Sequence, residues 1–262
     1  WTAPVTPGPA TITATSVENP QRSASTTVTV VAAPFISTFT ATPGTLAYGG
    51  TGSLAYTFGN GTGSLDQGVG AVTSGGTTPT PALTATRTYT LTVTNAAGTT
   101  VSQTATFTVT PVAVGAVTPA ASVISVGGAR TFSATATGGV SNALTWSASA
   151  GTMNPTTGAW TAPATAQVVT ITATSQEDAT KSASTTVNVV ALPAITAFTA
   201  TPGTVAYGAA SALAYTFTGG TGSIDQGVGA VTSGGTSGTG ALTATRTYTL
   251  TVTNAAGATA TQ

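Results

Sequence analysis

The strongest constraint on this chain is an internal repeat with a period of 159 residues. Residues 1–103 align without a gap with residues 160–262, and 74 of the 103 aligned positions are identical. The motif WTAP at Trp1 returns at Trp160, and stretches such as DQGVGAVTSGG are unchanged. A period this long exceeds the roughly 20–50 residues of a solenoid unit. It suits two domains of about 80 residues each.

Proline-marked breaks divide each period into two parts. Apolar tails end at Pro34 and at Pro193, and a similar break falls at Pro111. Proline cannot donate a hydrogen bond to a strand ladder, so it limits strand continuation. The short junctions favour a semi-rigid, rod-like array of tandem domains. The four predicted segments are A1 (residues 1–33), B1 (34–111), A2 (112–192) and B2 (193–262).

Two of the four segments lack part of the repeat. A1 lacks its first strands, and B2 lacks the strand equivalent to Thr104–Thr110. The part that is absent corresponds to residues 104–159, and the chain starts at Trp1 rather than at Met. We therefore expect a processed or excised window of a longer array. Adjoining sequence of the same polypeptide, or a strand donated by a neighbouring subunit, would complete its ends.

Strand-like alternation runs through the whole sequence. In stretches such as Tyr89–Thr94 and Ala105–Thr110, apolar or aromatic residues alternate with threonine, which makes up 65 of the 262 residues. A period of two indicates a strand with one buried and one wet face. Threonine keeps a high strand propensity while it presents a hydroxyl to water. With turn clusters such as Asn95–Gly98 between the runs, the pattern predicts an all-β chain of sandwich domains.

The amino-acid composition excludes most kinds of catalytic and metal-binding site. The chain has no His and no Cys, five basic and five acidic side chains, and a net charge of zero. The usual zinc, copper and iron–sulfur ligand sets are missing, as are Ser-His-Asp and Cys-His catalysis and disulfides. Five scattered basic side chains do not form the positively charged surface that binds a nucleic-acid backbone. No apolar run reaches the roughly 20 residues of a membrane span, and no signal peptide is recognised. We therefore predict no enzyme, no cofactor and no metal.

A family resemblance follows from two groups of motifs. A2 contains VGG at Val126, LTWS at Leu144, GAWTAP at Gly158 and VTITAT at Val169, and in this it resembles a bacterial Ig-like (Big-type) domain. B1 and B2 contain TYTLTVTNAAG, which resembles the Tyr-x-Cys-x-Val-x-Asn of an immunoglobulin F strand. The resemblance implies tandem Ig-like β-sandwich domains of bacterial surface or adhesin-like proteins.

The same resemblance implies a set of structural core residues. Trp146 occupies the strand position at which this fold buries a Trp between its sheets. Tyr89 and Tyr248 correspond to corner tyrosines, whose hydroxyls bond nearby backbone. Leu91 and Leu250 stand where an antibody domain has Cys.

The repeated tryptophans and the charged residues of the B segments are also expected to have structural roles. Trp1 and Trp160 are expected to pack rather than to stack on a ligand. B1 has a single Asp66–Arg87 pair, and B2 repeats it with Asp225 and Arg246. Glycoside hydrolysis needs two carboxylates about 5–10 Å apart. One carboxylate per segment instead predicts a turn Asp or an ion pair.

Three of the remaining charges lie in one loop of A2, and two others, Glu18 and Arg22, occupy the matching positions of A1. Glu177, Asp178 and Lys181 lie in SQEDATKS between two predicted strands, and A1 has Asn19 in place of Asp178. Calcium takes six to eight oxygen ligands, so two adjacent carboxylates are too few. We expect a charged surface loop without a metal.

The sequence therefore favours a non-catalytic, structural extracellular protein on a bacterial cell surface: the stalk, fibre or surface-coat segment of a larger adhesin-like protein. The alternatives are a carbohydrate- or receptor-binding Ig-like module, or the spacer of a secreted enzyme. Exposed aromatic side chains in a planar row would favour binding. Zero net charge promotes association, so copies of the chain itself are expected partners in a fibre or layer, beside neighbouring Ig-like domains of the same chain.

Overall fold

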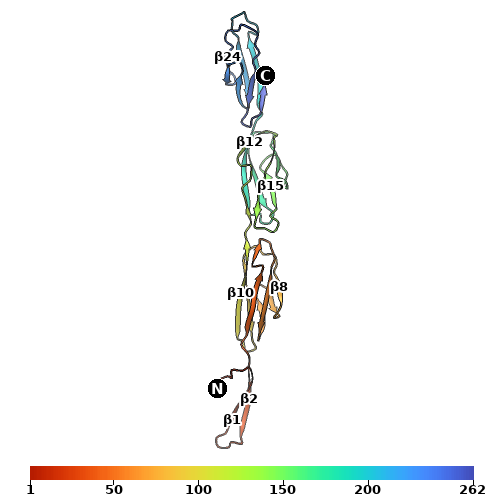
Figure 1. Cartoon of the computed structure of the whole chain (residues 1–262), viewed down its shortest axis with the longest axis vertical. Coiled ribbons are helices and arrows are strands. Elements are labelled where there is room, and N and C mark those ends of the chain that lie inside the picture. Colours follow the sequence, from red (N-terminus) through yellow and green to blue (C-terminus); the bar gives the residue numbers. More distant parts are fainter. The chain divides into compact units, whose positions relative to one another are not determined.

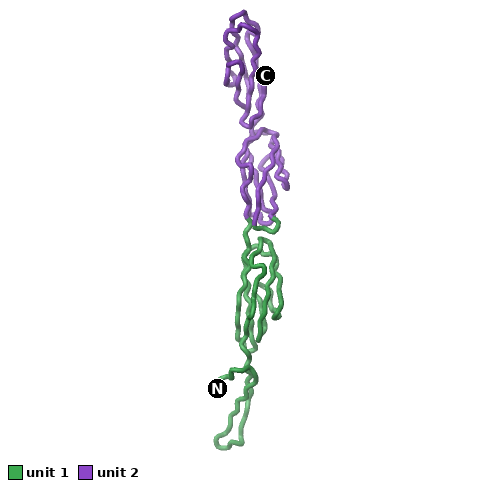
Figure 2. Tube along the Cα trace, in the orientation of Figure 1, with its two compact units in different colours: residues 1–112, 138–141 green, residues 113–137, 142–262 purple.

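A computed structural model describes all 262 residues, which form 26 strands and no helix (Figure 1). The chain divides into two compact units (Figure 2). The first unit comprises residues 1–112 and 138–141, and the second comprises residues 113–137 and 142–262. Because no long apolar helix forms, no helical membrane span is present.

B1 is a two-sheet sandwich within the first unit. One sheet has the strand order β3-β5-β8, and the other has the order β4-β10-β9-β6-β7. Neighbouring strands are antiparallel except for β4, which pairs in parallel with β10. Two antiparallel sheets with connections that cross between them form an Ig-like arrangement. The strand bounds are β3 Phe35–Thr42, β4 Thr45–Ala47, β5 Ser53–Gly59, β6 Thr62–Leu65, β7 Gly70–Val72, β8 Thr77–Pro79, β9 Arg87–Thr94 and β10 Thr100–Thr110.

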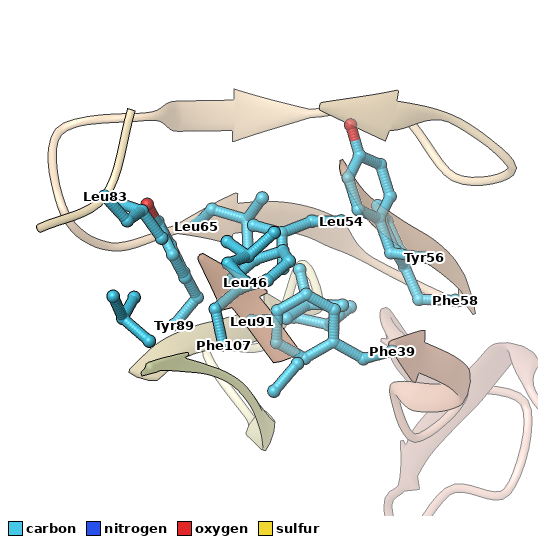
Figure 3. Packing of buried hydrophobic residues seen from close by; sticks show 13 residues of the cluster. Phe39, Leu46, Leu54, Tyr56, Phe58, Leu65, Leu83, Tyr89, Leu91 and Phe107 are labelled. Atoms are coloured by element: carbon cyan, nitrogen blue, oxygen red, sulfur yellow. The ribbon is translucent and has the colours of Figure 1, made fainter. Parts of the chain in front are cut away.

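The alternation in the sequence decides which side chains of B1 enter its core. In β9, Tyr89, Leu91 and Val93 are buried, and the threonines between them lie on the opposite, half-exposed face. Both sheets contribute to the packed interior (Figure 3). The rings of Tyr89 and Phe107 meet edge to face, with their centroids 6.0 Å apart.

A2 is the sandwich at the start of the second unit. Its sheets have the orders β12-β19-β18-β15, β13-β17-β16 and β11-β14. The core gathers around Trp146, Trp160, Phe132 and Ile171. The strand bounds are β11 Ala113–Val114, β12 Ser122–Ser125, β13 Ala129–Thr131, β14 Ala136–Thr137, β15 Leu144–Ala148, β16 Thr152–Met153, β17 Ala159–Thr161, β18 Gln167–Ser175 and β19 Ser182–Val190.

B2 repeats B1 with fewer strands and a smaller core. Its sheets have the orders β20-β21-β24 and β23-β22-β25-β26. The counterpart of β4 is not a strand, and β25 begins at Leu250, whereas its counterpart β9 begins four residues earlier in the repeat, at Arg87. The strand bounds are β20 Ala194–Thr201, β21 Ala212–Thr218, β22 Thr221–Ile224, β23 Gly229–Val231, β24 Thr236–Gly238, β25 Leu250–Thr253 and β26 Thr259–Thr261.

A1 is a single hairpin in the first unit. Its strands β1 (Gly8–Thr15) and β2 (Ser23–Val30) pair from Gly8 with Val30 to Thr15 with Ser23. The hairpin matches β18 and β19 of A2 in sequence, but its side chains are mostly exposed. The prediction of an all-β chain of tandem Ig-like domains is confirmed, since every segment is built of strands and B1 has the full two-sheet topology.

Candidate functional site: the asparagine joint

The most elaborate polar site of the first unit surrounds Asn95, which follows β9 and is 8% exposed. Its side-chain Oδ1 accepts hydrogen bonds from the backbone N–H groups of Ala97 (3.1 Å) and Thr99 (2.9 Å). Its Nδ2 donates to the carbonyl of Ala32, in the stretch between A1 and B1, at 2.9 Å. One buried amide therefore shapes its own turn and also holds the connecting chain.

The second unit repeats this site at Asn254, which is 6% exposed. Oδ1 accepts from the N–H groups of Ala256 (3.0 Å) and Ala258 (2.9 Å), and Nδ2 donates to Ala191 O at 2.8 Å. Nδ2 also lies 3.0 Å from the Oγ of Ser125, at the end of β12. We call the site with these shared bonds the asparagine joint.

A shallow hollow adjoins each asparagine joint. The hollow in the first unit has a volume of about 490 Å³ and the one in the second unit about 400 Å³. Their linings correspond position by position: Val31 and Val190, Gly61 and Gly220, Thr62 and Thr221, Thr94 and Thr253, Asn95 and Asn254. Neither lining contains a charged side chain, so neither hollow offers an acid, a base or an activated nucleophile. The chemistry of the joint is confined to hydrogen bonding.

The first hollow differs from the second at one position. Asn60 lies there in the left-handed region, with φ of 58°, and its Nδ2 donates to Ala33 O at 2.9 Å. Its counterpart Gly219 has φ of 76°, and a Cβ there would lie 3.0 Å from the carbonyl carbon of Leu192. The side-chain bond that Asn60 makes to the connecting chain therefore has no counterpart at Gly219 in the second joint.

The residues expected to form the structural core lie as follows. Trp146 in β15 is 6% exposed, Tyr89 is 1% exposed, and Leu91 and Leu250 are completely buried. Tyr248 is only half-buried, and its hydroxyl donates to Thr239 O at a distance of 3.4 Å. Tyr89 differs in that its ring packs edge to face against Phe107 of β10.

The two repeated tryptophans differ in their surroundings. Trp160 is 2% exposed, its Nε1 donates to Ala150 O at 2.9 Å, and its ring meets Phe132 at a centroid distance of 6.1 Å. Trp1 is 70% exposed, contrary to the expectation that it packs. Trp1 does not have the contacts that Trp160 makes with Phe132 and Ala150.

The B-segment aspartates act within turns. Oδ1 of Asp66 accepts a hydrogen bond from the N–H of Thr90 at 2.9 Å, and Asp225 accepts from Thr249 at 2.8 Å. The Asp66 carboxylate therefore bonds the turn after β6 to Thr90. The Asp225 carboxylate bonds the turn after β22 to Thr249. The alternative of an ion pair with Arg87 or Arg246 is not what the structure contains.

The charged loop between β18 and β19 is organised around Asp178. The hydroxyl and the N–H of Thr180 donate to its Oδ1 at 2.6 Å and 3.0 Å. These two bonds, with the positive charge of Lys181, lower the pKa of the Asp178 carboxyl from its usual value. No three Asp, Glu, His or Cys side chains gather anywhere in the chain as a metal site.

Exposed aromatic side chains do not gather into a row within either unit. Trp1 (70% exposed) and Phe35 (48% exposed) belong to the first unit, and Tyr207 (84% exposed) belongs to the second. Tyr56 and Tyr215 are buried, and their hydroxyls bond Thr78 Oγ1 (2.9 Å) and Ser237 Oγ (2.8 Å). The structure therefore lacks the feature that would favour sugar binding by stacking.

Comparison with known proteins finds relatives by structure alone. No profile of a known protein family matches the chain, and comparison with curated proteins by sequence finds no match. The solved structures similar to it include the N-terminal eight Ig domains of Down Syndrome Cell Adhesion Molecule, with a TM-score of 0.38 and 14% identity over 100% of this chain and 46% of that one.

Two further similar structures are shorter Ig arrays. The three N-terminal domains of the Highly Immunogenic Outer Capsid protein of bacteriophage RB49 give a TM-score of 0.43 and 16% identity, covering 87% of this chain and 97% of that chain. The I-band fragment I67–I69 of titin gives 0.38 and 14%, covering 88% and 98%. At these values the likeness concerns the fold alone.

The sequence pattern predicts a turn at Asn95–Gly98 but gives no indication of the asparagine joint. The turn is present, and its Gly98 N–H donates to Asn95 O at 3.0 Å. The available signal was the unchanged NAAG in both copies of the repeat, at a position where other turn residues serve equally well. The bond to Ala32, 63 residues away, has no signature in the local pattern.

Proposed function

We propose that the chain is a non-catalytic, structural segment of an extracellular repeat protein, of the bacterial Ig-like (Big-type) kind. The single observation that carries the proposal is the asparagine joint. A buried amide binds the connecting chain at both A-to-B junctions, in addition to organising its own turn. Domains that act independently of one another do not require a buried side chain that bonds the chain segment between them.

The chemistry of the chain supports a passive role. The polar side chains are mostly Thr and Ser, and the few carboxylates described above hold turns. Charged residues make up 4% of the chain. Function is argued from the sites that a fold carries and not from the fold itself, and the sites of this chain offer hydrogen bonds that hold turns and connections.

We also propose that copies of the chain associate side by side. Net charge far from zero keeps proteins apart, and here it is zero. Small side chains such as Thr, Ser, Ala and Gly lose little conformational entropy when an interface orders them.

Two measurements test these roles. Antibody against the chain, applied to intact cells of the source organism, is expected to label the surface without permeabilisation. Labelling that appears only after permeabilisation contradicts an extracellular role. Analytical ultracentrifugation of the purified chain is expected to reveal oligomers that grow with concentration. A monomer at every concentration, unchanged by salt, contradicts self-association.

A further inference from the structure

The most informative difference between B1 and B2 concerns one strand. In B1, the second half of β10 lies between β9 and β4: Ala105 pairs with Tyr89, and Val109 pairs with Leu46. The N–H of Thr108 donates to Gly44 O at 2.9 Å, outside the regular ladder.

A second bond fixes the same stretch of β10. The N–H of Val109 donates to Thr86 Oγ1 at 3.1 Å. Between these bonds Phe107 is completely buried in the B1 core (Figure 3). This half of the strand is therefore held by backbone pairing on two sides and by one large side chain.

In B2 the corresponding space is an open groove of about 430 Å³. Gly203 and Thr245, the counterparts of the two acceptors Gly44 and Thr86, both line it. Residues 204–206 and 246–249, which would pair on either side, have no ladder partner. Tyr207 at its edge is 84% exposed, whereas its counterpart Tyr48 is partly buried.

We propose that this groove of B2 binds an extended β-strand supplied by a further repeat of the same kind. The strand alternates threonine with apolar residues, as Thr104–Thr110 does in B1. Its backbone N–H groups donate to Gly203 O and Thr245 Oγ1, and its apolar side chains enter the B2 core. A strand added to an open sheet edge gains its affinity from the main chain and its specificity from alternate side chains. The proposal does not depend on the extracellular role proposed above.

The groove also selects the size of the central side chain. In B1 the residue facing Phe107 is Gly52, and a Cβ there would lie 2.9 Å from the Cζ of Phe107 and closer still to Cε1. The counterpart of Gly52 in B2 is Ser211, which is 7% exposed and donates to Pro202 O at 2.7 Å. A phenylalanine in the strand that fills B2 would therefore collide with the Ser211 side chain.

The repeat provides a precedent for such a paired change of size. In B1, Phe35 lies opposite Gly59, where a Cβ would come 2.6 Å from the Cε1 of the Phe35 ring. In B2 the same pair is Ala194 opposite Thr218. B2 therefore has the larger Thr218 at the position of Gly59, and the smaller Ala194 at the position of the Phe35 ring. By the same logic, Ser211 in place of Gly52 indicates a strand with a residue smaller than Phe at the position of Phe107.

A second copy of this chain is a poor donor of the strand. Its only matching strand carries Phe107, which is completely buried in its own B1 core. Donation would empty that core, and it would place a ring against Ser211. The occupant is therefore a related strand with a smaller central residue.

The test extends the full chain after Gln262 with the sequence of Thr104–Thr110, in one version with Phe and in another with Val at the central position. Hydrogen exchange is measured at the Tyr248 and Arg246 amides, whose counterparts Tyr89 and Arg87 pair with β10 in B1, and not at the Thr249 amide, which already donates to Asp225. With Val, we expect protection to rise at least about tenfold over the chain without an extension, because several new hydrogen bonds form. With Phe, we expect a clearly smaller rise.

A second pair of chains separates size selection from pairing itself. These chains carry S211G, and their amide protection is measured relative to the S211G chain without an extension. In this background we expect the Phe extension to give the same protection as the Val extension. A version with Pro at the central position, which can neither pair nor fill the core, serves as the control. If neither the Val nor the Phe version raises protection above this control, the groove is not a strand site. If Phe and Val protect equally in the Ser211 chain, the size selection is wrong.

Discussion

Asn254 makes four hydrogen bonds from one buried side chain, two as an acceptor and two as a donor. Asn254→Ala leaves the N–H groups of Ala256 and Ala258 and the carbonyl of Ala191 without that partner. Because Ala256 and Ala258 are half-buried and Ala191 is exposed, losing these bonds should cost about 0.5–1.5 kcal/mol, as for a typical hydrogen bond. We therefore expect the free energy of unfolding of B2 to fall by about that amount, measured by urea unfolding followed at B2 amide resonances.

The control for this prediction is Asn188→Thr. Asn188 is an exposed residue of β19, and its counterpart in A1 is Thr29. Exposed substitutions of this kind change stability by about 0.5 kcal/mol or less. Equal effects of the two substitutions would contradict a special role for the asparagine joint.

Asp178 provides a second test at the scale of single residues, based on pH. Its pKa is lowered in the folded chain by the Thr180 hydroxyl, by the Thr180 N–H and by Lys181. A carboxyl with a lowered folded pKa stabilises the fold above its unfolded pKa, and this contribution is lost as pH falls through the folded pKa. We expect Thr180→Ala to raise the pKa of Asp178 toward its usual value, as measured by a side-chain NMR titration.

A1 contains the natural comparison for that titration. The matching turn has Asn19, whose Oδ1 accepts from Gln21 N–H at 3.2 Å and has no charge to lose. The Asn19 side chain has no ionisable proton, so it cannot reproduce the pH-dependent change that we expect at the Asp178 side chain. An Asp178 titration that is identical with and without the Thr180 hydroxyl would contradict the assignment of its cause.

At the scale of strands, the pairing of β3 with β5 tests how side chains change together. Gly59→Thr alone puts a side chain against the Phe35 ring, and overpacking of this kind costs about 1–3 kcal/mol. Adding Phe35→Ala reproduces the B2 pair Ala194–Thr218 and should recover most of the loss. Phe35→Ala alone should cost less than burial of a full ring implies, because the ring is 48% exposed.

The measurement is a double-mutant cycle on the unfolding of B1. Contacting residues commonly couple by about 0.5–3 kcal/mol, and here the coupling should favour the double variant. Additive effects of the two substitutions would show that the Phe35–Gly59 contact does not decide which residues β3 and β5 tolerate.

At the scale of the whole molecule, the buried residues form three separate cores, in B1, A2 and B2. Leu91→Ala opens a cavity in the B1 core, and such substitutions cost about 2–5 kcal/mol. Trp146 and Trp160, which report on the A2 core, share no contact with Leu91 in these clusters. We expect the variant to lower the midpoint of B1 unfolding and to leave the tryptophan fluorescence transition unchanged.

Leu250→Ala in B2 is the matched variant for this experiment. Leu250 is as completely buried as Leu91, but it lies in a core of six buried hydrophobic residues rather than thirteen. A tryptophan transition that shifts with Leu91→Ala would contradict independent cores.

The strands and their inward faces could be predicted from the sequence, because both depend on local alternation. Tyr89, Leu91 and Val93 are buried at every second position, as a period of two requires. The repeat extends this conclusion to B2, where Leu250 and Val252 are buried at equivalent positions. The Ig-like topology was implied by the resemblance of the motifs around Trp146 and of TYTLTVTNAAG to Ig-like domains.

The sequence by itself determined the strand content, the repeat and the absence of His and Cys chemistry, since all three are read from neighbouring or matching residues. The tertiary structure alone decided the rest. Asn95 reaches Ala32, and Asp66 reaches Thr90 instead of Arg87, because folding brings distant backbone groups within bonding distance. Identical residues also meet different surroundings. Trp1 is exposed where Trp160 is buried, because burial depends on the strands that cover a side chain and not on the side chain itself.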